Sequence, residues 1–307
     1  MNNNINIYYN WPKDVWWSHK EIDDLEPDAK INRIINYSNI LKNFKSEPNS
    51  NVILKGYADD FLKLYVRELM IGESICSDKN EDIESQINFI ENMICNPNEK
   101  RMNKKAKNIY NVVTEIFNDP FIPNLSIENF NFKLIMKIHE IIMKDLLEDN
   151  GKVRRTEAKA IGENWNYLDS EKIVDELQNL LMKTVTFAKN IDQINDLHEK
   201  LEKMVKLGAQ FLVRFLYIHP FANGNGRVGR ILLSYLLSNV SGVPVSLYLK
   251  NIGRNVYLGC LRQAQENHYV NTESLAMFIL NSIYKNLVDV TYALELETDF
   301  KQLLVCL

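Results

Sequence analysis

The shortage of turn-forming residues is the feature of this sequence that most constrains its fold. Only 11 of the 307 residues are glycine and 8 are proline, which is about half of their usual combined share. Glycine and proline end helices and form tight turns, so a chain with few of them favours long helices. Apolar residues also recur at helical spacing, as in Ile31, Ile34, Ile35 and Leu41. We therefore predict a mainly α-helical protein.

Length, charge and cysteine content narrow the class of function. A chain of 307 residues is long enough for one large or two medium domains with a packed core. The formal net charge of −4 gives no bulk attraction to nucleic acid. No apolar run reaches membrane-spanning length, the N-terminus lacks a secretory signal, and four scattered cysteines fit a reducing compartment. We expect a cytoplasmic protein without nucleic-acid or membrane partners, and export by another route stays open.

The predicted helices fall into two blocks. A polar stretch at 96–101 marks the expected boundary between an N-terminal helical region, residues 1–100, and a larger domain, residues 101–288, which a tail follows at 289–307. From the spacing of apolar residues and the polar breaks, helices are expected near 31–44, 58–75, 82–94, 105–117, 127–147, 170–188, 194–218, 226–238, 254–266 and 272–287.

Two further elements are expected from local breaks in this pattern. The polar segment at 149–152 introduces a non-helical stretch at 153–167, which is the best place for a short β-hairpin. One more short helix is expected within 295–307. The predicted architecture is therefore a helical bundle with a single small hairpin.

One segment of the second block ends a helix and opens another. A long apolar helix runs into His219-Pro220, and because proline disfavours helical geometry in the residue before it, the helix should end at His219. A turn that contains Gly224 and Gly226 follows and opens the next helix. The free backbone N–H groups and the dipole at such a helix start suit a phosphate.

The charged residues of the same segment fit this interpretation. Arg227 and Arg230 lie three residues apart, on one face of the second helix, and two guanidinium groups suit a polyphosphate better than a single carboxylate. His219 can accept a proton near neutral pH. A base, a phosphate cradle and two arginines together predict phosphoryl or nucleotidyl transfer.

Each of these features has a simpler explanation when it stands alone. A histidine before proline is usually only a helix end, an isolated G-x-G is usually a plain turn, and two arginines at this spacing usually form a solvated helix face. What favours a catalytic loop is their order within the twelve residues 219–230.

This order resembles the signature of the Fic family, H-x-F-x-(D/E)-G-N-G-R-x-x-R. The matching positions are His219, Phe221, Asn223, Gly224, Asn225, Gly226, Arg227 and Arg230. Asn223 departs from the pattern, because the family has an acidic residue there. The resemblance covers about residues 105–287 and implies a Fic-type helical bundle with a β-hairpin flap. The Trp11-Pro12 opening is weakly similar to the N-terminal helical extension of many Fic proteins.

The resemblance implies a protein adenylyltransferase, which transfers AMP from ATP to a Ser, Thr or Tyr hydroxyl of a target protein. His219 would be the general base that deprotonates the hydroxyl, and Phe221 would pack inward and hold the loop. The phosphates would contact Gly224, Asn225, Gly226, Arg227 and Arg230. Mg²⁺ would lie at Asn223, whose neutral carbonyl oxygen is a weaker ligand than a carboxylate, so ATP phosphates would supply most of its coordination.

Two segments outside the signature extend the resemblance. Gly151-Lys152-Val153-Arg154, followed by Ile161-Gly162, resembles the flap that lies over the acceptor segment, so target contacts are expected at Ala160, Ile161 and Gly162. Such flaps bind through backbone pairing, and their side chains do not name the target. Arg254 and Tyr257 resemble the helix that walls the nucleoside.

Many Fic proteins also carry an inhibitory helix, with the pattern [S/T]-x-x-x-E-[G/N], whose glutamate pairs with the second arginine of the signature. This chain has no complete match. The helix near 58–82 stands where the N-terminal version belongs, but Cys76 falls at the expected glutamate position. Glu81 and Glu73 are the remaining candidates, and Glu295 is less favoured. We expect a degenerate control element and an enzyme that is less restrained than a self-inhibited relative.

Several alternatives to this interpretation remain. His19, His139, His198 and His268 have no second ligand at metal spacing, so a zinc site is not expected. Other members of the fold use UTP, GTP or CDP-choline as donor. A non-catalytic Fic-like regulator is a further alternative, against which the intact histidine argues. Removal of AMP usually relies on the inhibitory glutamate, so the degenerate element argues against it. Auto-modification and homodimerisation stay open.

Overall fold

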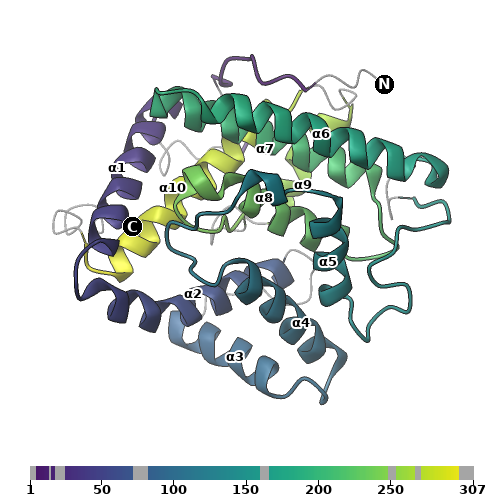
Figure 1. Ribbon diagram of the computed structural model, residues 1–307, viewed down its shortest axis with the longest axis horizontal. Coiled ribbons are helices and arrows are strands. Elements are labelled where there is room, and N and C mark those ends of the chain that lie inside the picture. Colours follow the sequence, from purple (N-terminus) through teal and green to yellow (C-terminus); the bar gives the residue numbers. More distant parts are fainter. Residues whose placement is uncertain are drawn as a thin grey trace.

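The computed structural model describes residues 5–13, 15–17, 25–71, 82–159, 166–247, 254–266 and 271–296. The mainly helical prediction is confirmed over these residues (Figure 1). The α-helices are α1 (Pro27–Lys45), α2 (Ser50–Ile71), α3 (Ile83–Cys95), α4 (Arg101–Ile116), α5 (Phe132–Ile142), α6 (Ile173–Asp192), α7 (Leu197–Ile218), α8 (Asn225–Ser241), α9 (Arg254–Glu266) and α10 (Glu273–Ala293), with 3₁₀ turns η1 (Ile127–Asn129) and η2 (Ser170–Lys172).

Helices α7 and α8 lie at the centre of the bundle and are joined by the predicted motif. Asp196 starts α7 by accepting hydrogen bonds from the amides of His198 and Glu199. Packing against α6, α8, α10 and α1 buries most of α7 from Met204 onward. Gly208 lets α8 approach closely, since a Cβ there would lie 2.9 Å from Leu233. The loop between α7 and α8 is therefore mounted on a deeply buried pair of helices.

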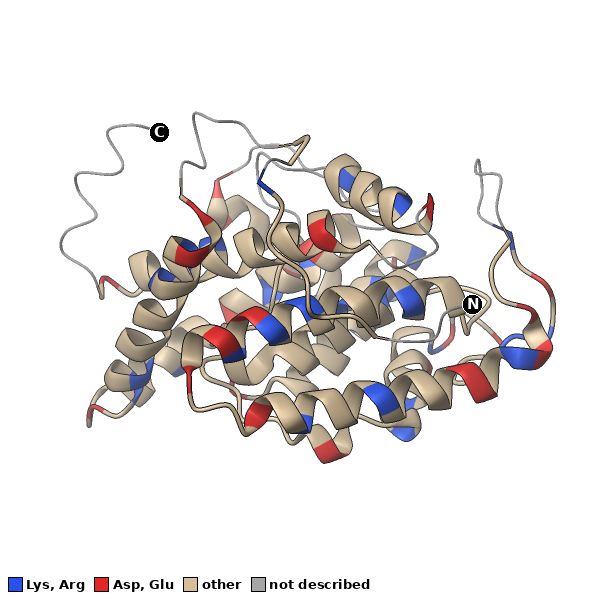
Figure 2. Cartoon of the chain, turned by 90° about the horizontal axis from the view of Figure 1, so that it is seen from above, with Lys and Arg blue, Asp and Glu red and all other residues tan. Residues whose placement is uncertain are grey.

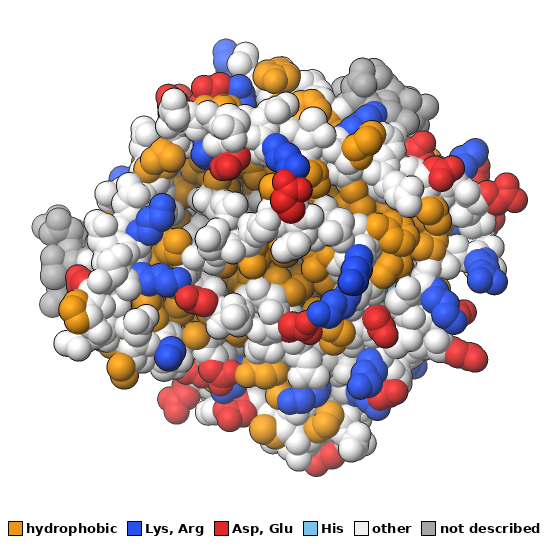
Figure 3. All heavy atoms as spheres, viewed as in Figure 1, with side chains coloured by type: hydrophobic (Ala, Val, Ile, Leu, Met, Phe, Trp, Pro, Cys, Tyr) orange, Lys and Arg blue, Asp and Glu red, His pale blue; other side chains and the backbone are white. Residues whose placement is uncertain are grey.

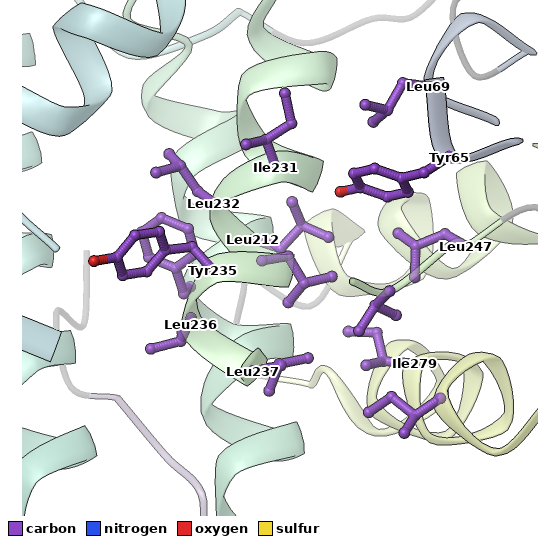
Figure 4. Close-up of a cluster of buried hydrophobic side chains, with 14 of the residues drawn as sticks. Tyr65, Leu69, Leu212, Ile231, Leu232, Tyr235, Leu236, Leu237, Leu247 and Ile279 are labelled. Carbon is purple, nitrogen blue, oxygen red and sulfur yellow. The ribbon is translucent and has the colours of Figure 1, made fainter. Parts of the chain in front are cut away.

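The N-terminal region packs directly on this central pair. Helix α1 lies along α10 and α7, while α2, α3 and α4 form a group at the lower edge of Figure 1. Tyr65 and Leu69 of α2 reach toward Ile231 of α8 (Figure 4). One hydrophobic core includes Ile34 of α1, Tyr65 of α2 and Leu232 of α8. The core is thus continuous across the predicted boundary near residue 100.

Helix α2 begins earlier than the sequence pattern predicts. Residues 45–51 form a polar break in the sequence and the predicted helix starts only at residue 58, whereas α2 begins at Ser50. The Ser50 hydroxyl donates to the carbonyl oxygens of Lys45 at 3.1 Å and Glu47 at 2.8 Å. These bonds close a tight turn, so the polar break is only the short connection from α1 to α2.

The predicted helix at 127–147 is wrong as a single element. The chain forms η1 first, and α5 then starts afresh at Phe132, because the Asn131 side chain accepts a hydrogen bond from the Leu134 amide at 3.1 Å. Helix α5 ends at Ile142, and Asp145 beyond it has a φ of 56°. An internal capping residue therefore divides a segment whose apolar periodicity is continuous.

The predicted hairpin is present only as a minimal pairing in the described residues. An antiparallel bridge joins Lys159 to Asn166, and the Tyr167 amide donates to the Ala158 carbonyl at 3.1 Å. At the other end of the chain, α10 extends to Ala293, beyond its predicted end at 287 and across the predicted boundary at 288. Most of the short helix predicted within 295–307 lies outside the described residues.

Charges of both signs are mixed over the surface. Lysine and arginine alternate with acidic residues along the helices (Figure 2), and hydrophobic side chains appear between charged ones on the face in Figure 3. Exposed pairs such as Lys104–Asp145, at 2.9 Å, contribute at most about 1 kcal/mol each. Among the described residues, no helix is both long enough and apolar enough to cross a membrane.

Candidate active site

His219 follows the last residue of α7 in a strained backbone conformation. Its φ of 48° and ψ of 58° lie in the left-handed region, which costs a residue with a Cβ about 1–2 kcal/mol. Its amide donates to the Phe215 carbonyl at 3.0 Å, and Arg154 Nε donates to its carbonyl at 2.8 Å. These two bonds hold the strained backbone and so fix the origin of the imidazole side chain.

The surroundings of the imidazole indicate which ring nitrogen carries its hydrogen. Nδ1 of His219 lies 3.2 Å from the carbonyl oxygen of Leu216. A carbonyl oxygen only accepts, so Nδ1 is the protonated nitrogen of the neutral ring. Nε2 then holds the lone pair, and it is the atom that can remove a proton from an approaching hydroxyl. His219 is half-buried.

Tyr167 covers one face of the His219 ring. The two ring centroids are 3.7 Å apart and the planes are inclined by 12°. Tyr167 directly follows the Lys159–Asn166 bridge, so the segment that resembles a flap is in contact with the candidate base. The stacked ring restricts rotation of the imidazole, because one face is already occupied.

Arg154 ties the base of the same segment to the end of α7. Nη1 donates to the Thr156 carbonyl at 2.7 Å, and Nη2 donates to the carbonyls of Leu168 and, at 3.4 Å, Ile218. The Arg154 amide donates to the Pro220 carbonyl at 2.8 Å. Because carbonyl groups at the end of a helix lack intrahelical partners, a buried guanidinium there satisfies several at once. Arg154 therefore couples the flap segment to the backbone around His219.

Phe221 and Asn225 shape the loop that leads into α8. The Asn225 side chain accepts from the Phe221 amide at 3.0 Å and donates to the Phe221 carbonyl at 2.7 Å. Both side chains are buried, and Phe221 packs inward. The Asn225 side chain, at the first position of α8, is thus used to hold the loop. Gly224 precedes the helix with a φ of 85° and no side-chain cap, which leaves the first turn suited to an anion.

Arg227 lies beneath the loop, with 1% of its surface exposed. Its Nη2 donates to Asn223 Oδ1 at 3.3 Å and lies 3.8 Å from the sulfur of Met143. Asn223 itself is exposed. The oxygen predicted as a weak metal ligand therefore accepts a hydrogen bond from a cation, and the adjacent positive charge disfavours a metal ion there.

Arg230 is equally buried and contacts the N-terminal region. Its Nη2 donates to the carbonyl oxygen of Leu69 at 2.8 Å, within the last turn of α2. A second link holds the same helices together, because the Tyr65 hydroxyl lies 2.7 Å from Ser234 Oγ on α8. Glu68 of α2 accepts from the Leu247 amide at 3.0 Å. The second arginine of the motif is thus in contact with the end of α2 in this structure.

Several predicted residues lie outside the described part of the chain. These are Ala160, Ile161 and Gly162 of the flap and the two candidate inhibitory residues, Glu73 and Glu81. Their predicted roles stay predictions.

Tyr257, the predicted nucleoside neighbour, is described and lies on α9. It is buried, and its ring packs against Phe278 of α10, with ring centroids 6.2 Å apart. In this arrangement Tyr257 supports the helix packing, and its contact with a nucleoside stays a prediction. Arg254, the other residue expected at the nucleoside, begins α9.

Three residues near the motif have contacts that the sequence alone does not predict. Tyr167 stacks on His219, Arg154 binds the backbone around it, and His139 stacks on Phe221. From the sequence alone, His139 is only a histidine without a second metal ligand, and Arg154 is only one residue of the flap-like segment. A histidine within an otherwise apolar helix face is the one local signal that could have singled out His139.

Comparison with known proteins identifies the class of this fold. Residues 129–237 match the family model described as Fic/DOC family. The Caenorhabditis elegans protein Fic-1 has the same fold, with a TM-score of 0.61 and 16% identity over 87% of this chain and 73% of that chain. A Fic family protein of Desulfovibrio desulfuricans gives a TM-score of 0.60 and 15% identity, over 95% and 79% of the two chains. Residues 129–237 thus match the Fic/DOC family, and the chain has the helical fold of Fic proteins.

Curated relatives match shorter segments. A protein of Aquifex aeolicus named probable protein adenylyltransferase is 37% identical over 98 residues, or 32% of this chain and 27% of that protein. A Fido domain-containing protein of Dictyostelium discoideum is 40% identical over 86 residues, 26% of this chain and 58% of that protein. A protein of Ostreid herpesvirus 1 named ribonucleoside-diphosphate reductase small chain is 26% identical over 126 residues, 38% of this chain and 21% of that protein. The chain therefore spans between 21% and 58% of these relatives.

Proposed function

We propose that this chain is a protein adenylyltransferase, which transfers AMP from ATP to a Ser, Thr or Tyr hydroxyl of another protein. One observation carries the proposal. A single loop joins the lone-pair nitrogen of His219, at the end of α7, to the uncapped start of α8 and the buried guanidinium groups of Arg227 and Arg230. The adenylyltransferase name of the Aquifex aeolicus relative supports it.

The proposed reaction begins with proton transfer to the histidine. His219 Nε2 takes the proton of the acceptor hydroxyl, and the hydroxyl oxygen attacks the α-phosphorus of ATP. A new P–O bond forms while the bond from the α-phosphorus to the oxygen bridging the α- and β-phosphates breaks. Pyrophosphate leaves with that electron pair. The guanidinium groups of Arg227 and Arg230 and the first amides of α8 offset the charge that develops on it.

Mg²⁺ enters this proposal as part of the substrate. Among the described residues, no group of three or more His, Cys, Asp or Glu side chains could hold a metal ion. The oxygen of Asn223 accepts a hydrogen bond from Arg227, and it is a neutral ligand. These residues do not fit a Mg²⁺ ion held by the protein, so we assign the ion to the oxygens of the ATP phosphates.

The acceptor side of the site is proposed to be a target protein, or a second copy of the chain in auto-modification. The flap segment places Tyr167 on the base, so an acceptor hydroxyl has to approach along the edge of the imidazole. Residues 160–162 are proposed to pair with the acceptor backbone. A homodimer, expected from the resemblance, stays a prediction.

A transfer of another phosphate-containing group is the second candidate. UTP and GTP present the same triphosphate to Arg227, Arg230 and the start of α8, so these contacts alone do not select adenine. CDP-choline carries a diphosphate and would therefore make fewer of these phosphate contacts. A non-catalytic regulator is disfavoured because the strained backbone at His219 is held by Arg154 and the Phe215 carbonyl, an arrangement typical of functional sites.

A donor panel tests the proposed function directly. The full-length chain is incubated separately with ATP, UTP, GTP and CDP-choline, each with Mg²⁺, and its intact mass is then measured. We expect a gain of one AMP with ATP and no gain in His219→Ala. A gain from another donor would replace AMP in the proposal. If no donor added mass to the chain, and none of the donors in labelled form labelled a protein of an added cell extract, the proposal would be overturned in favour of the regulator.

A further inference from the structure

His139 lies in α5, outside the signature loop, yet it is in direct contact with that loop. Its side chain is fully buried. Its ring stacks on Phe221, with centroids 3.7 Å apart and planes inclined by 2°. A fully buried histidine is uncommon unless its nitrogens are satisfied, so the hydrogen bonds of this ring define what it does.

The two ring nitrogens bind two different segments. Nε2 lies 3.0 Å from the carbonyl oxygen of Asn223 in the signature loop. Nδ1 lies 2.9 Å from the amide of Gly151, which donates to it. Gly151 is the first residue of the flap segment, whereas Asn223 lies four residues after the candidate base. One imidazole thus connects the loop that faces the phosphates with the start of the flap segment.

The chemistry of these partners fixes the state of the ring. The Gly151 amide can only donate, so Nδ1 must hold a lone pair, and Nε2 must carry the hydrogen that the Asn223 carbonyl accepts. Burial lowers the pKa of His139 to about 4, and the charge of Arg227 adds to this effect, while the bond to Asn223 opposes it. The neutral ring, with one donor and one acceptor, is therefore the form that is present near pH 7.

Both connected segments also rest on α5 through glycine. Gly151 has a φ of 71°, and a Cβ there would lie 3.1 Å from Cβ of Glu140. Gly224 has a φ of 85°, and a Cβ there would lie 3.2 Å from the sulfur of Met143, just beyond α5. The backbone at both glycines therefore closely approaches residues at or just beyond the C-terminal end of α5, next to His139, which makes this end of α5 the common support of both segments.

We infer that His139 is a positioning residue, which holds the phosphate-facing loop and the start of the flap segment in one fixed arrangement through its two opposed hydrogen bonds. The effect of His139 on catalysis rests on the proposed function. The clamp, by which we mean the two hydrogen bonds of His139 to Asn223 and Gly151, does not. The loop bond places Asn223 and the turn that leads to Arg227. The Gly151 bond places the segment that carries Arg154 and Tyr167 onto His219.

Two conservative variants separate the bonds. His139→Asn keeps an acceptor near the Nδ1 position and loses the bond to Asn223. His139→Gln keeps a donor near the Nε2 position and loses the bond to Gly151. His139→Phe keeps the ring stacking and loses both. Asn108→Ala is the matched control, because the Asn108 side chain also supports the end of α5, by donating to the Ile142 and Lys144 carbonyls.

The kinetics of AMP transfer should distinguish these variants by whether nucleotide KM or kcat changes. We expect His139→Asn to raise the nucleotide KM about five- to tenfold with kcat nearly unchanged, as for loss of one hydrogen bond. His139→Gln should lower kcat by a similar factor at nearly unchanged nucleotide KM, His139→Phe should do both, and Asn108→Ala should do neither. If His139→Phe kept wild-type KM and kcat in its folded fraction, the effect on catalysis would be refuted.

Hydrogen exchange tests the clamp without any activity. The Gly151 amide should exchange slowly in the wild type, in His139→Asn and in Asn108→Ala, and much faster in His139→Gln and His139→Phe. Equal protection of this amide in all variants would overturn the inference. A wild type that transfers no group but shows this exchange pattern would overturn the proposed function alone.

Discussion

The two ends of the signature loop differ in what surrounds them. At the His219 end, the side chain is half-buried, and its neighbours come from the flap segment, through Tyr167 and Arg154. At the Arg230 end, the guanidinium is 1% exposed and donates to the Leu69 carbonyl of α2. One end is thus partly exposed beside the flap segment, while the other is covered by the N-terminal region.

This difference separates two kinds of control. In the proposed reaction, the flap segment would govern how a hydroxyl reaches His219, whereas α2 would govern how Arg230 reaches a phosphate. A guanidinium has five N–H donors, so the Leu69 contact orients Arg230 and occupies one donor without removing its charge. Arg230 donates to the backbone carbonyl of Leu69. This bond therefore does not require the inhibitory glutamate that the family pattern places where this chain has Cys76.

The His219 end should show the largest loss on substitution. We expect His219→Ala to lower kcat about 10²- to 10⁴-fold, because this is the usual contribution of a general base. Nucleotide affinity, measured by calorimetry, should stay unchanged, since the proposed phosphate contacts lie at the other end. If His219→Ala lowered nucleotide affinity by the same factor as kcat, the two ends of the loop would not have separate roles.

At the Arg230 end, substitution should change the affinity for ATP more than it changes kcat. Arg230→Met should weaken ATP binding about 10- to 100-fold, since a hydrogen bond to a charged group contributes about 1.5–3 kcal/mol. Arg33→Met is a suitable control, because Arg33 donates to the Tyr284 hydroxyl at 3.1 Å, away from the loop. Equal affinities for ATP in the two variants would contradict a phosphate role for Arg230.

Between the two ends, Asn223 offers a way to sharpen the metal assignment. Asn223→Asp should lower the Mg²⁺ concentration needed for half-maximal rate several-fold, because a carboxylate is a better ligand. The new charge would also pair with Arg227, which limits the gain. The measurement is a Mg²⁺ titration of the rate at fixed ATP, with Asn223→Ala as control. An unchanged titration would mean that position 223 does not approach the metal.

A smaller effect is expected where α2 is attached to α8. Tyr65→Phe removes the bond to Ser234 and should lower the free energy of unfolding by about 1 kcal/mol. Urea unfolding of Tyr65→Phe, Ser234→Ala and the double variant forms a cycle that isolates the pair. Strictly additive single effects would show that this bond does not help to hold α2 at Arg230.

The smallest effect is expected from the acidic residues after α2. Glu73→Gly and Glu81→Gly should leave the rate of auto-modification unchanged, because the predicted control element is degenerate and Arg230 already contacts the Leu69 carbonyl. The rate of label incorporation from ATP checks this. A large gain from either substitution would show that a glutamate still restrains Arg230.

Local features of the sequence predicted much of the architecture and failed at identifiable places. The helix end at His219 follows from Pro220. The last helical residue of α7 is Ile218, and His219 is the residue that caps the helix. The start of α2 and the division before α5 were missed, because single hydroxyl and amide groups at Ser50 and Asn131 decide those boundaries. The position of a cap is a geometric property that apolar periodicity does not report.

The sequence by itself determined the helical class, the order of the signature residues and the helix end that strains His219, since each depends on residues close together in the chain. Only the tertiary structure decided the partners of those residues. Arg230 and Leu69 are 161 positions apart, and His139 and Asn223 are 84 positions apart. Such contacts arise when separate helices pack on one core, and no local pattern specifies which carbonyl a buried guanidinium or imidazole will meet.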